Sequence, residues 1–275
     1  MKYHAIDVRV LDRVKPPYFI GAMLRGALGY TLKKVVCINP SYQCEGCFDT
    51  SRCLYYDFYE RENVQHLFRL DLVLESECYR FGLYLFGDAC VKLPYLLLAI
   101  EKALKENGLG RARLKFNAVE IYVDGEPVYQ EGAFLADLTS KPQSLISSGY
   151  CPNLKIQLLT PLRIKQSNSV EYNDIGIKDI LRSIHQRVQQ LFHHQTCHRL
   201  PYEPSYTTEI KTLTYKPLYR KSSRQKRSIV LDGVLGEMAV IGLDQRSYDL
   251  LKIGEVIGVG KQTVFGMGKI KVAKI

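Results

Sequence analysis

The stretch GEVIGVGKQTVFGMGK, residues 254–269, holds five glycines and two lysines just before the final strand-like run of the chain. A second glycine-rich basic stretch, GLGRAR at residues 108–113, occupies the same place in the first half. Each stretch separates a helix-like run from a strand-like run, and glycine at such a point permits backbone conformations with positive φ. This correspondence aligns the two halves of the chain, and the alignment predicts the fold.

The first half predicts six elements. Alternating apolar residues at 4–11 indicate a strand, and a helix follows at 18–35 behind two prolines, which the first turn tolerates. The pattern then predicts strands at 67–75 and 79–87, a helix at 93–106 that stops at Asn107-Gly108, and a strand at 114–123.

The second half repeats this order. It predicts a strand at 154–164, a helix at 178–194, strands at 208–219 and 228–240, a short helix at 244–252 and a last strand after the glycines. We therefore predict an α+β chain of two tandem ferredoxin-like (RRM-like) domains with a C-terminal glycine-rich loop. Their expected bounds are 1–135, with a cysteine-rich insertion at 37–53, and 150–275, and the segment 130–152 is the expected linker.

Charge is distributed unevenly along the 275 residues. Residues 1–150 carry 18 basic and 18 acidic side chains, whereas the remainder carries the whole net charge of +10. Segregation of this kind favours a surface that binds a polyanion. The start of the chain lacks the pattern of a signal peptide, and no apolar run is long enough to span a membrane, so we expect a cytoplasmic protein.

The densest basic segment lies at 211–227, where tyrosines are interleaved and acidic residues are absent. Strand-like runs flank it, so we expect a protruding basic hairpin that follows the phosphates of RNA while its tyrosines stack on bases. The expected RNA-binding residues here are Lys211, Lys216, Arg220, Lys221, Arg224, Lys226 and Arg227, with Arg163 and Lys165 extending the surface.

The C-terminal glycine-rich loop predicts a second RNA contact. A nucleotide-binding P-loop would place Ser or Thr after its lysine and continue into a helix, but Gln262 follows Lys261 and a strand comes next. We expect the loop to cradle the phosphates of RNA instead, through Gly258, Gly260, Lys261, Gly266, Gly268 and Lys269.

These pieces together resemble a known family. RGALG at 25–29, LYLFG at 83–87, LPYLLLAI at 93–100, GLGRAR, LTPLRIK at 159–165 and VGKQTVFGMGK occur in the order found in CRISPR-associated repeat-cleaving endoribonucleases of the RAMP superfamily. The subgroup it looks like has a four-cysteine cluster after the first helix. The resemblance implies a tandem ferredoxin-like fold and metal-independent cleavage of precursor CRISPR RNA by 2′-hydroxyl attack, which leaves a 2′,3′-cyclic phosphate.

The residue pattern of the first predicted helix allows two interpretations. Arg25, Gly29 and Lys33 recur every four residues and so share one face, with Gly26 and Tyr30 beside it. Close packing of the helix on its sheet would explain the glycines, whereas a surface facing RNA would explain the cations as well.

Cleavage without a metal needs a base, an acid and cations around the phosphate. The resembled family often has a histidine in or just after the first helix, but this chain has none between residues 18 and 65. Its catalytic candidates are therefore Tyr30, Lys33 and Lys34, in line with relatives that use lysines, or else His4 and His185 from elsewhere in the chain.

Four cysteines predict a closed metal site. Cys37, Cys44, Cys47 and Cys53 lie within seventeen residues, and CEGC has the spacing of a zinc knuckle. We expect a structural zinc ion and no catalytic metal, with an iron–sulfur cluster or free thiols as the alternatives.

Three functions are compatible with these observations. The first is an endoribonuclease that cleaves CRISPR repeat RNA and retains its product. The second is a catalytically inactive crRNA-binding subunit of a CRISPR effector complex, and the third is an unrelated zinc-containing protein that binds nucleic acid. The resemblance allows other CRISPR effector or adaptation proteins as partners, and either a monomer or a homodimer.

Overall fold

The computed structural model describes residues 1–62, 64–135, 141–145, 149–166, 169–171, 175–222 and 227–275. The chain forms two compact units. The first comprises Met1–Leu70 and Glu75–Ser144, and the second comprises Asp71–Leu74 and Leu145–Ile275. The change from one unit to the other at residue 145 falls within the segment that the sequence predicts to be a linker.

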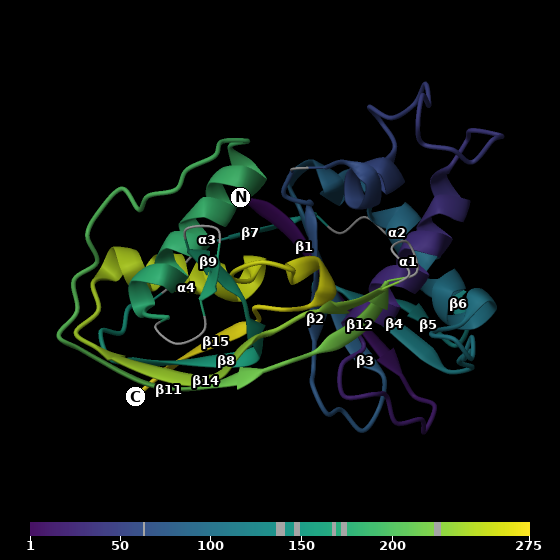
Figure 1. The fold of residues 1–275 in the computed structure, drawn as a ribbon. Helices are drawn as coiled ribbons and strands as arrows, with labels where there is room; N and C mark the ends of the chain where they lie inside the picture. The colour runs from purple at the N-terminus through teal and green to yellow at the C-terminus, as the bar shows by residue number, and fades with distance from the viewer. Residues whose placement is uncertain (63, 136–140, 146–148, 167–168, 172–174, 223–226) are drawn as a thin grey trace. The chain divides into compact units, whose positions relative to one another are not determined.

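The first unit is built on one sheet with two main helices (Figure 1). In chain order its elements are β1 (Lys2–Val10), α1 (Gly21–Val36), the helical turn η1 (Tyr56–Glu60), β2 (Phe68–Leu72), β3 (Arg80–Phe86), the turn η2 (Gly87–Lys92), α2 (Leu93–Lys102), the turn η3 (Ala103–Asn107), β4 (Val119–Val123), β5 (Glu126–Gln130), β6 (Ala133–Phe134) and β7 (Gln143–Ser144).

The strands of this sheet lie in the order β2-β3-β1-β4-β5-β6, and β7 pairs with the start of β1. The order of the first four strands is that of a ferredoxin-like domain, in which β1 and β3 are central. Burial alternates along β1, with Ile6, Val8 and Val10 in the core. The helices α1 and α2 pack against each other.

The second unit repeats the arrangement (Figure 1). Its elements are β8 (Leu154–Leu162), β9 (Ile164–Gln166), β10 (Ser169–Glu171), α3 (Ile177–Phe192), β11 (Thr208–Lys216), β12 (Tyr219–Ser222), β13 (Arg227–Val230), β14 (Gly233–Ile241), α4 (Gln245–Ile257), the turn η4 (Thr263–Phe265) and β15 (Ile270–Lys274). The main sheet has the order β11-β14-β8-β15, and β9–β10 and β12–β13 form separate hairpins.

The predicted order of the main elements is confirmed in both halves, but some boundaries differ, and short strands such as β5, β9 and β10 were not predicted. The helix expected at 93–106 ends as the wider turn η3, and β4 begins at Val119 because Leu114 is bonded back to Leu109. The expected linker contains β6 and β7, which pair with the first sheet. Residues 136–140 and 146–148 of that linker lie outside the described part of the chain.

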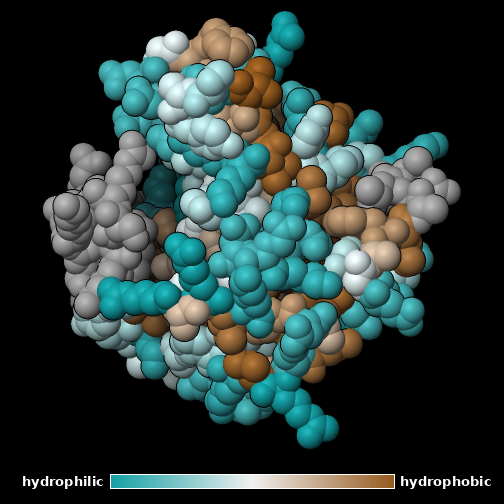
Figure 2. All heavy atoms as spheres, turned by 90° about the vertical axis from the view of Figure 1, so that its right-hand side faces the viewer, coloured by the Kyte–Doolittle hydropathy of each residue, from teal (hydrophilic) through white to brown (hydrophobic). Residues whose placement is uncertain are grey.

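Hydrophilic side chains are interspersed with apolar ones on the face drawn in Figure 2. Within the described ranges, no helix combines the length and the apolar content that crossing a bilayer demands.

His4 lies in the core of the first unit. Its side chain is 2% exposed, and its Nδ1 lies 2.6 Å from Oδ2 of Asp124. The other carboxylate oxygen of Asp124 accepts a hydrogen bond from the backbone N–H of Ala5 at 2.9 Å. The pair therefore ties the turn after β4 to β1, which accounts for this histidine without a catalytic role.

We expect His4→Ala to lower the free energy of unfolding by about 2 kcal/mol, because it removes buried volume and a hydrogen bond of Asp124. Chemical denaturation followed by circular dichroism measures the change. His185→Ala is the control, since His185 is half-buried on α3, and it should cost less than about 1 kcal/mol. Equal costs for the two variants would contradict this assignment.

Candidate nucleic-acid interface

The face of α1 that carries Arg25 is covered by protein. The Arg25 guanidinium lies 4.5 Å from the ring centroid of Tyr59, and one of its nitrogens donates to the carbonyl of Phe58 at 3.2 Å. The Tyr59 hydroxyl donates in turn to the carbonyl of Arg25 at 3.1 Å. Burial raises the pKa of Tyr59 to about 12, against the opposing effect of the Arg25 charge, so the phenol stays protonated as a donor.

The next two positions on that face are covered in the same way. A Cβ atom on Gly29 would lie 2.6 Å from Cε1 of Tyr59, so only glycine admits this ring. The Lys33 ammonium lies 4.8 Å from the ring centroid of Tyr55, and the two tyrosine rings stack at 5.3 Å. Gly29 is therefore buried, and Arg25 and Lys33 are half-buried against aromatic side chains of the 55–59 segment, so this face is less open to RNA than the sequence suggests.

The exposed side of α1 lies one residue further along. Gly26, Tyr30 and Lys34, also spaced by four, form the open stripe of α1, and all three are exposed. Tyr30 is 55% exposed, and a Cβ atom on Gly26 would meet nothing within 4 Å. This stripe is therefore the part of the helix that a ligand can reach.

The charges around Tyr30 lower the pKa of its phenol. A hydrogen bond from Lys34 and the charge of that ammonium lower the pKa of the Tyr30 phenol, and the charge of Arg113 adds to the effect. The Lys34 ammonium lies 4.5 Å from the centroid of the Tyr30 ring and 3.5 Å from Oδ1 of Asn107. A tyrosine and a lysine thus stand together on an exposed helix face, and both side chains can act as general acids or bases.

The remaining histidine candidate belongs to the second unit. His185 is half-buried on α3, and burial together with the charge of Arg246 lowers the pKa of its imidazole. Its neutral form is therefore the favoured one near neutral pH, and its catalytic role stays a prediction.

The C-terminal glycine-rich loop is mostly buried, which corrects the expectation that all its glycines cradle phosphates. A Cβ atom on Gly268 would lie 1.8 Å from the carbonyl oxygen of Val259, and one on Gly260 would lie 2.3 Å from that of Arg163. Gly258 and Gly266 are buried with positive φ, at 76° and 81°. These glycines are required for the internal packing of the loop, and Lys261 with its neighbour Gln262 is the exposed part.

Three expected RNA-binding cations have partners inside the second unit. Arg163 is ion-paired with Asp232, and its side chain is 19% exposed. The Lys269 ammonium lies 2.5 Å from Oδ2 of Asp71, and Lys211 donates to the carbonyl of Ile175 at 3.3 Å. Pairing reduces the charge that Arg163 and Lys269 can offer to RNA.

The basic hairpin is confirmed in its backbone. The strands β12 and β13 pair antiparallel, with Arg220 opposite Ile229 and Lys221 opposite Ser228. Tyr219 is 72% exposed at its base, and Lys216 ends the preceding strand β11 half-buried. For Arg220, Lys221 and Arg227, and for Lys165 in β9, the structure describes the backbone alone. Arg224 and Lys226 lie outside the described residues.

The four clustered cysteines share one loop after α1. A turn joins Cys44 and Cys47, whose N–H donates to the Cys44 carbonyl at 3.3 Å, with Gly46 at a φ of 66°. Burial raises the pKa of the Cys53 thiol, and the charges of Cys37 and Cys44 contribute to the rise. Of the described residues, no three histidine, cysteine or acidic side chains converge closely enough to hold a metal ion in the arrangement seen here.

Comparison with known proteins covers both halves of the chain. Residues 1–143 match the family model AF_1859_N, described as an N-terminal domain, and the first half belongs to that family. Residues 156–270 match the model described as CRISPR-associated endoribonuclease Cas6. The second half of the chain is therefore similar to the CRISPR-associated Cas6 endoribonucleases. The family model supports the RNA-cleaving class that the sequence predicts.

Solved Cas6 structures share the fold. A Thermus thermophilus Cas6 in a product complex is 16% identical, with a TM-score of 0.58 and 99% of each chain covered. Another Cas6, in complex with a substrate mimic, is 14% identical, with a TM-score of 0.53 and coverage of 99% of this chain and 100% of that one. These matches confirm the two tandem ferredoxin-like domains. An Archaeoglobus fulgidus protein described as uncharacterized is 26% identical over 93% of this chain and 92% of its own.

Sequence reasoning missed two sets of residues around α1. Tyr55 and Tyr59, which cover one face, come from a segment without a recognisable pattern. Asn107 and Arg113, beside the open stripe, lie next to or within the GLGRAR stretch, so the repeated glycine-rich motif was a signal for them.

The two helix glycines give a matched stability test. Gly29→Ala should lower the free energy of unfolding by about 2 kcal/mol, because the new methyl group displaces the Tyr59 ring from Arg25. Gly26→Ala should raise it by about 0.5–1 kcal/mol, since the position is open and alanine favours a helix. Denaturant titration of both variants is the measurement, and a loss at Gly26 equal to that at Gly29 would contradict the assignment of faces.

Proposed function

We propose that this protein, like the Cas6 endoribonucleases that its second half resembles, cleaves the repeat sequence of CRISPR precursor RNA without a metal ion and retains its product. In this reaction the 2′-oxygen attacks the adjacent phosphorus, and the bond from phosphorus to the 5′-oxygen breaks. The products are a 2′,3′-cyclic phosphate and a 5′-hydroxyl. The proton of the 2′-hydroxyl passes to a base, and the leaving 5′-oxygen takes a proton from an acid.

The observation that carries this proposal is the pairing of Tyr30 with Lys34 on the open stripe of α1. In the proposed reaction Tyr30, whose pKa the neighbouring Lys34 lowers, accepts the proton of the 2′-hydroxyl, and the Lys34 ammonium supplies a proton or stabilises the charged phosphorane. Lys33 is half-buried with its ammonium over the Tyr55 ring, so we assign it a smaller part in the reaction than Lys34. The second unit supports retention of the product through its basic hairpin and the exposed Lys261.

Tyr30→Phe and Lys34→Ala should each reduce single-turnover cleavage of a labelled repeat RNA in EDTA by about 100-fold, because each removes a proton-transfer group. Lys33→Ala is the matched variant. Its cleavage rate should fall by a factor about tenfold smaller than that for Lys34→Ala, since the Lys33 ammonium lies on the Tyr55 ring.

Replacing the scissile 2′-hydroxyl by hydrogen should abolish cleavage and leave binding intact. Binding of repeat RNA with no cleavage by the wild-type protein would contradict the enzyme and support the inactive crRNA-binding subunit. Cleavage of the deoxy substrate, or full activity of Tyr30→Phe, would contradict the proposed chemistry.

We also propose that Cys37, Cys44, Cys47 and Cys53 bind a structural zinc ion. The turn at Cys44–Cys47 and the C-x2-C spacing support it, and the loop would have to tighten to bring all four sulfurs onto one ion. Four thiolates would close the coordination shell, so this ion would hold the loop and take no part in cleavage.

Elemental analysis of the purified protein should find about one zinc ion per chain, and Cys44→Ser with Cys47→Ser should lose it. Cys151→Ser, outside the loop, is the control and should keep the metal. Iron with visible absorbance would indicate an iron–sulfur cluster instead, and a metal-free wild-type protein would refute the site.

A further inference from the structure

The GLGRAR stretch forms a closed loop, which we name the arginine loop (residues 108–114). The N–H of Leu109 donates to the carbonyl of Leu114 at 2.8 Å, and the N–H of Leu114 donates back at 2.9 Å. Gly108 and Gly110 have φ angles of 74° and 70°, which glycine adopts without strain. A Cβ atom on Gly108 would lie 2.1 Å from the carbonyl oxygen of Arg113, so the loop closes tightly on itself.

One residue of the arginine loop departs from ordinary backbone geometry. Arg113 has a φ of 47°, in the left-handed region that a long side chain rarely occupies. Backbone strain of this kind persists where the surroundings impose it, and such residues cluster at functional sites. The closed loop imposes it here, because the N–H of Arg113 is itself bonded to the carbonyl of Gly110 at 3.3 Å.

The arginine loop is fixed beside α1. Leu109 is 2% exposed, and a Cβ atom on Gly110 would lie 2.8 Å from Sδ of Met23 on that helix. Immediately before the loop, the Asn107 side chain donates to the Thr31 hydroxyl at 3.2 Å. These contacts hold the loop against the helix that carries the open stripe.

Two guanidinium groups stand on this loop. Arg111 and Arg113 are both exposed, and within the described ranges no ion pair joins either of them to a carboxylate. Lys34 of α1 is the main cause of the lowered pKa of the Tyr30 phenol, and the positive charge of Arg113 adds to this effect. An exposed guanidinium suits a phosphate, because its planar fork can donate two parallel hydrogen bonds to phosphate oxygens.

We propose that Arg113 is a further active-site residue, which binds the scissile phosphate beside Tyr30, because the contacts to Met23 and Thr31 hold its loop against α1. A positive charge at this place also favours ionisation of Tyr30. The inference rests on the proposed RNA cleavage. In the reaction, the guanidinium holds the non-bridging oxygens while the phenolate takes the 2′-hydroxyl proton, and it stabilises the charge of the phosphorane. The tight turns of the arginine loop serve to hold this side chain in place.

The first test needs no RNA. Carbon-13 NMR of labelled tyrosine, with the Tyr30 signal assigned from Tyr30→Phe, follows the ionisation of that phenol in the wild type and in variants. Removing the positive charge in Arg113→Ala destabilises the phenolate, so the pKa of Tyr30 should rise, and Arg113→Lys should keep it near the wild-type value. An unchanged Tyr30 titration in Arg113→Ala would overturn the proposal.

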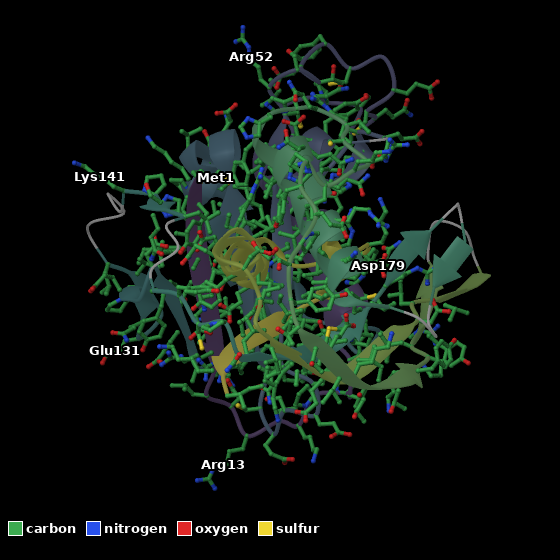
Figure 3. The ribbon with its side chains drawn as sticks, turned by 90° about the vertical axis from the view of Figure 1, so that its left-hand side faces the viewer. Met1, Arg13, Arg52, Glu131, Lys141 and Asp179 are labelled. Atoms are coloured by element: carbon green, nitrogen blue, oxygen red, sulfur yellow. The ribbon has the colours of Figure 1, made fainter. Side chains whose placement is uncertain are left out.

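The second test measures single-turnover cleavage of repeat RNA against pH. Arg113→Ala should cleave about 100-fold more slowly, the limb of the pH profile that reports the base should move to higher pH, and Arg113→Lys should recover part of the rate. Arg111→Ala removes the same charge from the same loop and is the matched control. Arg13→Ala, whose side chain points away from the ribbon in Figure 3, controls for total charge.

Cleavage by Arg113→Ala within about twofold of the wild type, or an equal loss in Arg111→Ala, would overturn the specific assignment to Arg113. A wild-type protein that cleaves no repeat RNA would refute the proposed function instead. In that case the NMR titration alone would decide whether Arg113 acts on Tyr30.

Discussion

The stacking of Arg25 on Tyr59 decides which side of α1 remains for a ligand. It buries one cationic face of the helix under aromatic rings, and Gly29 is the residue that lets the ring approach. With that face occupied, the open stripe of α1 is turned outward, and the arginine loop stands beside it. The proposed chemistry of Tyr30 depends on this arrangement, because a tyrosine in the covered row would be a buried, protonated phenol like Tyr59.

In the second unit, glycines of a motif that suggests phosphate binding serve the internal packing of the loop instead. Its glycines are placed where backbone segments approach each other too closely for a side chain, as between Gly268 and Val259. The loop therefore shapes the end of the sheet and exposes Lys261 at its surface. Some basic side chains of this half are paired internally, as Arg163 is with Asp232, whereas others belong to the hairpin.

Much of the fold could be predicted because each element carries its own periodicity, and the repeated order of elements aligned the halves. The faces of α1 could not be predicted, since Tyr55 and Tyr59 lie more than twenty residues from Lys33 in the chain and follow no pattern. The ion pair of Arg163 with Asp232 could not be predicted either, because spacing along the sequence does not reveal a contact between residues far apart in the chain. The glycines of the sequence indicated where tight turns lie. That the arginine loop lies beside α1 could be learned only from the three-dimensional structure.

A photo-crosslinking measurement tests the central claim, that RNA is cleaved on the open stripe of α1, most directly. A repeat RNA would carry 4-thiouridine at the cleavage position and a 2′-deoxy sugar that keeps it intact, and mass spectrometry would identify the crosslinked peptide. The account predicts crosslinks to peptides that contain Tyr30 or Arg113. Crosslinks confined to the 55–59 segment or to the second unit would contradict it.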